Sequence, residues 1–544
     1  MQDYLKQQIE AALRQLAPDL DIPEITIEKP RSPEHGDAAT NVALTLAKAL
    51  KDNPRSIAHK IAERIDATSG YIRSVDVAGP GFINFRFSDS WLADQLSVAY
   101  RAGSEYGKGC LLVNKSIQVE FVSANPTGPL TVGHGRNAVL GDTIARVLEW
   151  AGGDVQREYY FNNAGRQMRV LTESVRARYL QAVGKDAEFP EGGYEGAYIT
   201  EIAEKVRNEN GDNLTGEEHI AIFRKAAEEG IFEDIKQTLA RMNISMDSFF
   251  NENTLYEDGS IDKVIGLLRE KRLVYEEDGA TWFKTTEFGK EKDTVLIKSS
   301  GEPTYRLPDI AYHINKIERG FDLAIDVFGA DHIATYPDVV AGVKACGFDS
   351  EKIDVIVYQF VTIVKDGKPF KMSTRKANFV TLDELMDEVG ADVTRFFFLM
   401  RAPGTHLEFD IDEAKQAGEK NPVFYLQYAH ARIQSILRKV RENYDYSDKS
   451  LDFSLLNHDS EVTLIKRILE FPDIITQTAI QREPHKLINY LNDLATAFHK
   501  FYHDCRILGV DEQLAFARTG LLTVAAVVLA NGLGILGISA PDRM

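Results

Sequence analysis

The stretch Glu120–Asp142, EFVSANPTGPLTVGHGRNAVLGD, constrains the fold of this chain more than any other. The run Ile117–Val122 has the composition of a strand, a loop rich in glycine and proline follows, and Gly133-His134-Gly135 then opens a helical pattern. Glycines let a phosphate approach the backbone, and the amides and dipole of a helix start favour negative charge. This order of elements predicts a nucleotide-binding site in an α/β domain.

The glycine spacing separates this loop from two common nucleotide-binding motifs. Gly133 and Gly135 are followed next by Gly141, so the stretch is not G-x-G-x-x-G, and no Walker A lysine follows it. We expect His134, placed between two glycines, to face a ligand. The alternative is a core histidine whose hydrogen bonds are satisfied inside the protein.

The length of 544 residues favours three or four domains. Residues 1–107 begin with an amphipathic helix and contain alternating runs, which predicts a small α+β domain. Residues 108–390 are typical of an α/β domain with a helical, acidic insertion at about 166–250. Its parallel sheet is expected to be completed between about 290 and 365 by TVLIKSS, LAIDVFGAD and IDVIVYQFVTIV. Strands should disappear after about residue 391, so 391–544 is predicted to be all-α.

The charge distribution limits where an anionic partner could bind. The net charge of −19 requires any nucleic acid to meet a local basic surface rather than a global field. Residues 395–544 hold 17 basic and 19 acidic side chains, so nearly all of the negative charge lies upstream. Arg432, Arg438, Lys439 and Arg441 are grouped in this part, and the alternative to a binding surface is a solvated helix face.

A second stretch, Lys365–Phe379 (KDGKPFKMSTRKANF), is unusually basic. Such a loop is suited to a polyphosphate, because departing pyrophosphate needs its charge neutralised. An exposed basic loop without function is the alternative. The cations are Lys365, Lys368, Lys371, Arg375 and Lys376.

The cysteines and the apolar segments indicate in which cellular compartment the protein is expected. The three cysteines lie far apart and form no C-x-x-C pair, which suggests neither a disulfide framework nor structural zinc. The N-terminus lacks the pattern of a secretory signal, so we expect a cytoplasmic protein. The run Leu521–Ile538 is long enough for a membrane span, but Thr523, Asn531 and three glycines interrupt it. We expect a buried helix that ends near Asn531–Gly532 and no membrane contact.

Two motifs together resemble the signatures of class I aminoacyl-tRNA synthetases. P-L-T-V-G-H at 129–134 is similar to their H-x-G-H motif, and K-M-S-T-R at 371–375 to their K-M-S-K-S loop. Further runs resemble the arginyl-tRNA synthetase family, in the right order and over essentially the whole chain. They are EHGDAATNVALTLAK, GPGFINF, YYFNNAGRQM (159–168), YEGAYI (194–199), GEPTYRLPDIAYHINKIERGFD (301–322), FGADH (328–332), NPVFYLQYAHARI (421–433) and LGISAPDRM.

The chain departs from the family's pattern at two positions. The first histidine of H-x-G-H is Thr131 here, and the second lysine of K-M-S-K-S is Thr374. Threonine can donate one hydrogen bond to a phosphate but cannot carry an imidazolium charge. Arg375, Lys376 or Lys368 could supply the charge that is missing at 374.

The resemblance implies roles for individual residues. Catalysis is assigned to Thr131, Gly133, His134, Lys371, Ser373 and Arg375, and ATP binding to Gly133, His134, Gly135, Asp331, His332, Lys371 and Met372. Glu120, Ser123 and Asn125 should lie beside the backbone of the arginine substrate, with Tyr305 and Asp309 around its guanidinium. Arg432, Arg438 and Lys439 are candidates for contacts with tRNA.

The residue types agree with an arginine substrate, whose guanidinium and ammonium groups require carboxylates. Two of these carboxylates have simpler alternatives. Glu120 could be a solvated charge on an edge strand, and Asp309 could be the N-cap of the helix that begins before IAYH.

The resemblance also implies the fold and the reaction. We expect a Rossmann-like (HUP-type) parallel-sheet catalytic domain, an N-terminal α+β domain and an all-α anticodon-binding bundle. The expected substrates are ATP with Mg²⁺, L-arginine and tRNA(Arg), with no zinc and no organic cofactor, in a monomer. A non-catalytic tRNA-binding paralogue is the alternative that Thr131 and Thr374 suggest. A nucleotidyltransferase sharing H-x-G-H would not need the 150 helical residues that follow the second motif.

Overall fold

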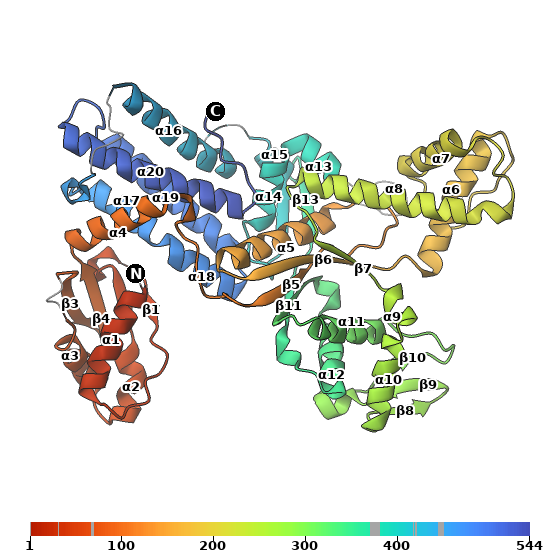
Figure 1. Ribbon diagram of the computed structural model, residues 1–544, viewed down its shortest axis with the longest axis horizontal. Coiled ribbons are helices and arrows are strands. Elements are labelled where there is room, and N and C mark those ends of the chain that lie inside the picture. The colour runs from red at the N-terminus through yellow and green to blue at the C-terminus, as the bar shows by residue number, and fades with distance from the viewer. Residues whose placement is uncertain are drawn as a thin grey trace.

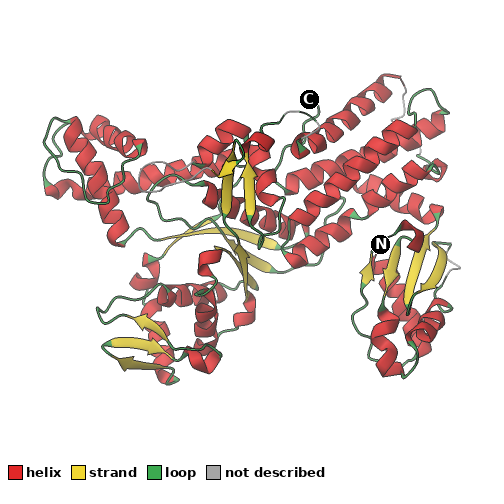
Figure 2. Cartoon of the chain, turned by 180° about the vertical axis from the view of Figure 1, so that it is seen from behind, coloured by secondary structure: helices red, strands yellow, loops and turns green. Residues whose placement is uncertain are grey.

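The computed structural model describes residues 2–30, 32–66, 70–369, 381–416, 418, 421–443 and 451–544. The predicted site residues Lys371, Met372, Ser373 and Arg375 lie outside the described residues, as does Thr374. Figures 1 and 2 show an N-terminal unit below a long helical bundle, a central sheet, a helical arm and a separate lobe beneath the sheet.

The N-terminal unit is the expected α+β domain. Its antiparallel sheet has the order β1-β2-β4-β3. Alternating apolar residues of β4 bury Ile83 and Phe85 against the helices. The elements are α1 (Gln2–Leu16), β1 (Ile27–Glu28), β2 (Ala38–Thr40), α2 (Val42–Leu50), α3 (Pro54–Ala62), β3 (Ile72–Ala78), β4 (Phe82–Phe87) and the connecting α4 (Asp89–Ala102).

The central sheet is fully parallel, with the order β12-β11-β5-β6-β7. The chain runs outward from β5 in one direction and from β11 in the other. The switch point between these strands is therefore where ligands bind in such sheets. The elements are β5 (Ser116–Glu120), α5 (Val132–Trp150), β6 (Asp154–Phe161), β7 (Ser248–Asn251), α11 (Arg306–Glu318), β11 (Leu323–Gly329), α12 (Tyr336–Cys346) and β12 (Ile353–Tyr358).

The insertion forms the helical arm of Figure 1. It comprises α6 (Gly165–Ala182), α7 (Ala197–Asn210) and α8 (Ile220–Arg241), and α8 returns to the central sheet. Strand β7 falls within the last residues of the expected insertion, yet it pairs with β6. The helical part of the insertion therefore ends with α8 at Arg241, before β7 joins the central sheet.

The assignment of TVLIKSS to the parallel sheet is wrong. Its strand, β10 (Thr294–Ile297), pairs antiparallel with β9 (Ala280–Phe283), which forms a hairpin with β8 (Val274–Glu277). Asp278 and Gly279 both have positive φ and make the tight hairpin turn. Pairing with this hairpin places β10 in the lower lobe of Figure 1. The same lobe contains α9 (Asn253–Glu257) and α10 (Ser260–Glu270).

A third sheet, of order β14-β13-β15, corrects two other expectations. The run IDVIVYQFVTIV divides between β12 and β13 (Val361–Lys365), so only its first half joins the parallel sheet. Strands do not end at 391, because β15 (Leu407–Asp410) pairs with β13. The remaining elements here are β14 (Lys368–Pro369), α13 (Leu382–Val389), α14 (Ala391–Leu399) and α15 (Ile411–Ala414).

The helical bundle confirms the all-α character of the C-terminal part beyond β15. Its helices are α16 (Pro422–Asn443), α17 (Asp459–Leu469), α18 (Phe471–Gln481), α19 (His485–Asp504) and α20 (Glu512–Ile535). By length and composition α20 could cross a membrane, but 72% of its most apolar 18 residues are buried inside the protein. It continues past the expected end at Asn531–Gly532 to Ile535, and Gly532 lets the helix pack closely on Leu491, since a Cβ there would lie 2.5 Å from that side chain.

Arg395 on α14 joins three parts of the chain. Its buried guanidinium donates to Asp142 on α5 at 2.6 Å, to the carbonyl of Met242 after α8 at 2.6 Å, and to the carbonyl of Leu536 after α20 at 2.8 Å. Gly537 has φ +72°, and a Cβ there would lie 2.2 Å from this guanidinium. The junction thus fixes α5, the insertion and the bundle against one another.

Candidate active site

The site lies at the switch point, where β5 ends abruptly. The strand stops at Glu120 because Val122 and Ser123 adopt positive φ, which is strained for a β-branched residue such as Val122. Asn137 of α5 stabilises this turn by accepting from the Val122 amide at 2.6 Å and donating to the Val327 carbonyl of β11 at 2.7 Å. The ends of β5 and β11 are thereby held against α5.

The first turn of α5 carries the predicted nucleotide site. Thr131 is its N-cap, and His134 Nδ1 accepts a hydrogen bond from the Thr131 amide at 3.1 Å. Burial lowers the pKa of His134, which favours the neutral ring. Among the described residues, a Cβ added at Gly133 would approach only Thr131 within 4 Å, so on this part of the chain the turn is open to a ligand. Gly135 instead faces the protein, because a Cβ there would lie 2.6 Å from Leu382.

Glu120 is buried in a network of charged side chains. Its Oε2 accepts a hydrogen bond from the Lys316 ammonium at 2.6 Å, and its Oε1 accepts one from Ser123 Oγ at 2.9 Å. Lys316 also donates to Asp326, which lies 2.7 Å from His313 Nε2. Burial raises the pKa of Glu120 although the Lys316 charge opposes the shift. Because β5 is central and Glu120 is paired, the solvated edge-strand alternative is wrong.

Asp309 lies in the first turn of α11 but does not cap the helix. The N-cap is Tyr305, whose side chain is 85% exposed, so the cap alternative for Asp309 is wrong. Burial and then the negative charges of Glu120 and Glu252 raise the pKa of Asp309 to about 7, although His313 opposes the shift. A carboxylate in such surroundings is stabilised by a cationic ligand.

A small pocket brings Asp309 together with His332. His332 belongs to the 3-10 turn Ala330–His332 that follows β11, and its ring stacks on Phe328 with the centroids 5.1 Å apart. Asp331 of the same turn is exposed. One pocket thus contains a residue predicted to bind arginine and another predicted to bind ATP.

Glu252 is a buried carboxylate at the candidate site that the sequence reasoning missed. It follows β7 and is buried, and its two oxygens accept from Tyr160 OH and Asn162 Nδ2, each at 2.8 Å. Burial raises the pKa of Glu252, and these neutral donors oppose the shift. Within the described residues neither Glu252 nor Asp309 forms a salt bridge. An acidic residue directly after the strand-like run SFFN was the pattern that could have indicated it.

Asn125 lies in the loop between β5 and α5. Its Oδ1 accepts from the Asn162 amide at 3.2 Å, and its Nδ2 donates to Gln167 at 3.0 Å. Ser123 accepts from the Tyr160 amide at 3.2 Å while it donates to Glu120. Both predicted substrate-binding residues therefore border β6 and the buried carboxylates.

The basic residues of α16 do not act as one group. Arg432 packs over the ring of Tyr502 at 4.9 Å and donates to its hydroxyl at 3.0 Å. Arg438 donates to the carbonyl of Asp542 in the C-terminal tail at 3.2 Å. Lys439 is exposed, seven residues and so about two turns from Arg432. Arg432 and Lys439 therefore lie on the same face of α16, whereas Arg438 contacts the C-terminal tail.

The fold and this site are those of a class I aminoacyl-tRNA synthetase, and the catalytic-domain model of that class matches the chain. The model described as "tRNA synthetases class I (R), catalytic domain" matches residues 102–396. "Arginyl tRNA synthetase N terminal domain" matches 3–87 and "DALR anticodon binding domain" matches 426–544.

Relatives identify the particular family. The arginine–tRNA ligase of Salinibacter ruber is 54% identical, with 100% of each chain covered. That of Desulfotalea psychrophila is 49% identical over 95% of this chain and 94% of its own. The Thermus thermophilus arginyl-tRNA synthetase has the same fold, with a TM-score of 0.79 at 23% identity over 100% of both chains. The chain belongs to the arginyl-tRNA synthetase family. The enzyme class is confirmed, and nothing in the comparisons favours a non-catalytic paralogue.

Proposed function

We propose that this enzyme activates L-arginine with ATP and transfers it to the 3′-terminal adenosine of tRNA(Arg). The observation that carries the proposal is the pair of carboxylates Asp309 and Glu252, which form no salt bridge among the described residues and lie near Glu120 at the end of β5. A guanidinium supplies both the missing charge and a fork of donors. Glu120 and Asn125 then border the ammonium and carboxylate of the substrate.

In the first step the arginine carboxylate attacks the α-phosphate of ATP, forming arginyl-adenylate and releasing pyrophosphate. The reaction needs positioning and charge stabilisation rather than a covalent nucleophile. His134 Nδ1 accepts from the Thr131 amide, so a neutral ring carries its proton on Nε2 and can donate there to a phosphate oxygen. We assign charge neutralisation at the pyrophosphate to Lys371 and Arg375, with Ser373 and Met372 in the same loop.

Mg²⁺ enters this proposal as part of the ATP substrate. The described residues contain no group of three or more His, Cys, Asp or Glu side chains arranged to hold a metal. The phosphate oxygens and water are therefore the proposed ligands of the ion, as Mg²⁺ commonly requires at nucleotide sites. The ion would offset the negative charge of the departing pyrophosphate.

In the second step the terminal adenosine hydroxyl of tRNA attacks the mixed anhydride and AMP leaves. Arg432 and Lys439 on α16 are proposed contacts with the anticodon stem or loop, because they are basic residues on one face of the least acidic part of the chain. We also propose that the enzyme acts as a cytoplasmic monomer in the charging of tRNA, the reaction for which its relatives are named arginine–tRNA ligases.

A substrate comparison tests this function. ATP–pyrophosphate exchange and tRNA charging should proceed with arginine and strongly disfavour lysine, because a site built for a fork loses paired hydrogen bonds with a point charge. Asp309→Asn and Glu252→Gln should each weaken arginine recognition by about 1.5–3 kcal/mol, the scale of hydrogen bonds to charged groups. Equal kcat/KM for arginine and lysine would overturn the proposal.

A further inference from the structure

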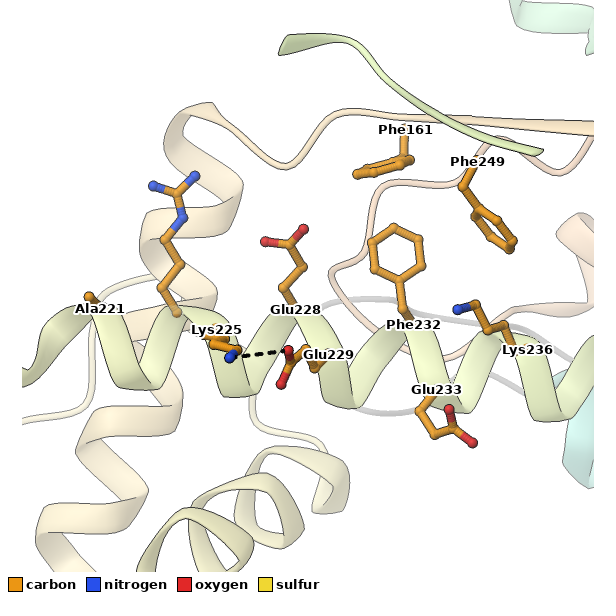
Figure 3. Close-up of a pocket in the computed structure, with 10 residues that line it drawn as sticks. Phe161, Ala221, Lys225, Glu228, Glu229, Phe232, Glu233, Lys236 and Phe249 are labelled. Atoms are coloured by element: carbon orange, nitrogen blue, oxygen red, sulfur yellow. Dashed lines mark ion pairs between the residues drawn. The ribbon is translucent and has the colours of Figure 1, made fainter. Parts of the chain in front are cut away.

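The two consecutive asparagines after β6, Asn162 and Asn163, lie between the insertion helix α8 and the buried carboxylate Glu252. They are part of the YYFNNAGRQM run, to which no function has been assigned so far. Figure 3 shows the adjoining groove, in which Glu228 and Phe232 rise from α8 toward Phe161 and Phe249. The asparagines directly follow Phe161, which lines this groove.

Asn163 is bound on three sides. Its Nδ2 donates to Glu228 Oε1 at 2.8 Å, its Oδ1 accepts from Asn253 Nδ2 at 3.1 Å, and its backbone carbonyl accepts from Arg224 of α8 at 3.1 Å. The amide thus uses both its donor and its acceptor, which neither aspartate nor an apolar residue could do here. Asn163 ties α8 to the residue that follows Glu252.

Asn162 connects the same loop to the site itself. Its Nδ2 donates to Glu252 Oε1 at 2.8 Å, and its Oδ1 accepts from the Ala164 amide at 2.7 Å. The Glu252 amide in turn donates to the Phe161 carbonyl at 2.9 Å. Because Glu252 has only neutral donors among the described residues, its orientation depends on where Asn162, Tyr160 and Tyr256 are held.

We infer that Asn162 and Asn163 are positioning residues that let α8 orient Glu252, and so set the affinity for the guanidinium of arginine. The inference rests on the proposed role of Glu252 in binding arginine. Arg224 and Glu228 of α8 each form one hydrogen bond with Asn163 and so hold the loop in place. Asn162 in the same loop donates to Glu252, so the orientation of the carboxylate depends on the position of the loop. No residue of α8 needs to touch the substrate.

Kinetics of charging separate this role from a purely structural one. Asn163→Ala and Glu228→Ala should each raise KM for arginine about tenfold, and KM for ATP should stay within about twofold, because only Glu252 is displaced. Glu228→Gln retains an acceptor oxygen and should raise KM for arginine less than Glu228→Ala does. Glu228 is half-buried on a helix, where alanine is favourable, so this variant should fold even if Asn163→Ala does not.

A double-mutant cycle and a matched control complete the test. If Asn163 acts through Glu252, then Asn163→Ala should add little to the KM for arginine in a Glu252→Gln background. Asn210→Ala is the control, because Asn210 lies in the insertion and, among the described residues, its side chain donates to the Val206 carbonyl of its own helix at 3.0 Å rather than to Glu252 or its neighbours. It should leave both KM values unchanged.

The outcomes distinguish this inference from the proposed function. If Glu252→Gln raises KM for arginine while Asn163→Ala and Glu228→Ala do not, the inference alone falls. Full additivity in the cycle, or equal rises in both KM values, would also overturn it. If the parent charges arginine and Glu252→Gln leaves its KM unchanged, the proposed role of Glu252 falls and the inference with it.

Discussion

The imidazole of His134 accepts a hydrogen bond at Nδ1 from the backbone amide of Thr131, three residues earlier, at 3.1 Å. The bond requires an unprotonated Nδ1, and burial lowers the pKa of His134, so the ring is neutral near pH 7 with its proton on Nε2. The threonine that replaces the family's first histidine thus still determines the tautomer of the second one through its backbone.

This tautomer leads to a prediction about two isosteric variants. His134→Asn can keep the acceptor near Nδ1 but has no donor at Nε2, whereas His134→Gln can place an amide donor near Nε2. We expect His134→Asn to lower kcat for pyrophosphate exchange by about 10²–10³, the usual loss for one transition-state donor, and His134→Gln to lower it less. A reversed order would mean that His134 acts through its Nδ1 contact alone.

The raised pKa of Asp309 predicts a pH dependence for arginine binding. Its pKa of about 7 means that the free enzyme is partly protonated at neutral pH, and the proton must leave before a guanidinium can bind. KM for arginine should therefore rise as pH falls, by about tenfold between pH 8 and pH 6, while KM for ATP changes less. Steady-state charging in buffers of equal ionic strength measures both. A flat KM for arginine over this range would contradict the prediction.

The Asp309 carboxylate should also destabilise the folded protein when no ligand is bound. Because the folded pKa of Asp309 lies above the unfolded value of 3.8, stability is lost as pH rises from about 4 through about 7. Asp309→Asn removes this loss, so at pH 8 the ligand-free variant should be more stable than the parent by about 1–3 kcal/mol. Thermal denaturation at pH 8 and pH 5 tests the sign, since the gain should be smaller at pH 5. An equal gain at both values would assign it to packing.

The divided basic cluster of α16 predicts unequal effects on tRNA binding. Arg432→Gln combined with Lys439→Gln should weaken binding and reduce the slope of log K against log salt by up to about 2, one per lost phosphate contact. Arg438→Gln should change the slope less, since Arg438 holds the C-terminal tail through Asp542. Filter binding at several salt concentrations measures the slope, and circular dichroism confirms that the variants fold. An unchanged slope in the double variant would place the tRNA contact elsewhere.

Local patterns in the sequence predicted the nucleotide-binding end of the site. A strand, a glycine-rich loop and a helix are contiguous between Glu120 and Asp142, and the placement of His134 follows from that order. The predicted roles of the individual side chains remain predictions. The turn at Val122 and Ser123, which ends β5 two residues early, could not be predicted, because positive φ at a β-branched residue is imposed by tertiary contacts such as that with Asn137.

The buried charges were beyond local patterns for a related reason. Lys316, Glu120 and Asp326 belong to three separate elements, and only the sheet order brings them together. Short strands were misassigned in the same way, since four residues of β10 or β15 have no periodicity that says which sheet they join. The Asp278-Gly279 turn was the one local indication that an antiparallel hairpin precedes β10.

The Arg395 junction bears on how this protein could be recombined with its relatives. One guanidinium satisfies carbonyls that follow two different helices and a carboxylate on a third, and Gly537 leaves space that no larger residue would. In a chimaera whose anticodon-binding bundle comes from another family member, α14, the residue after α8 and the segment after α20 must therefore be compatible with one another. Otherwise a buried cation is left without acceptors, at a cost of several kcal/mol. These distant segments therefore form one structural unit around Arg395, although each belongs to a different part of the fold.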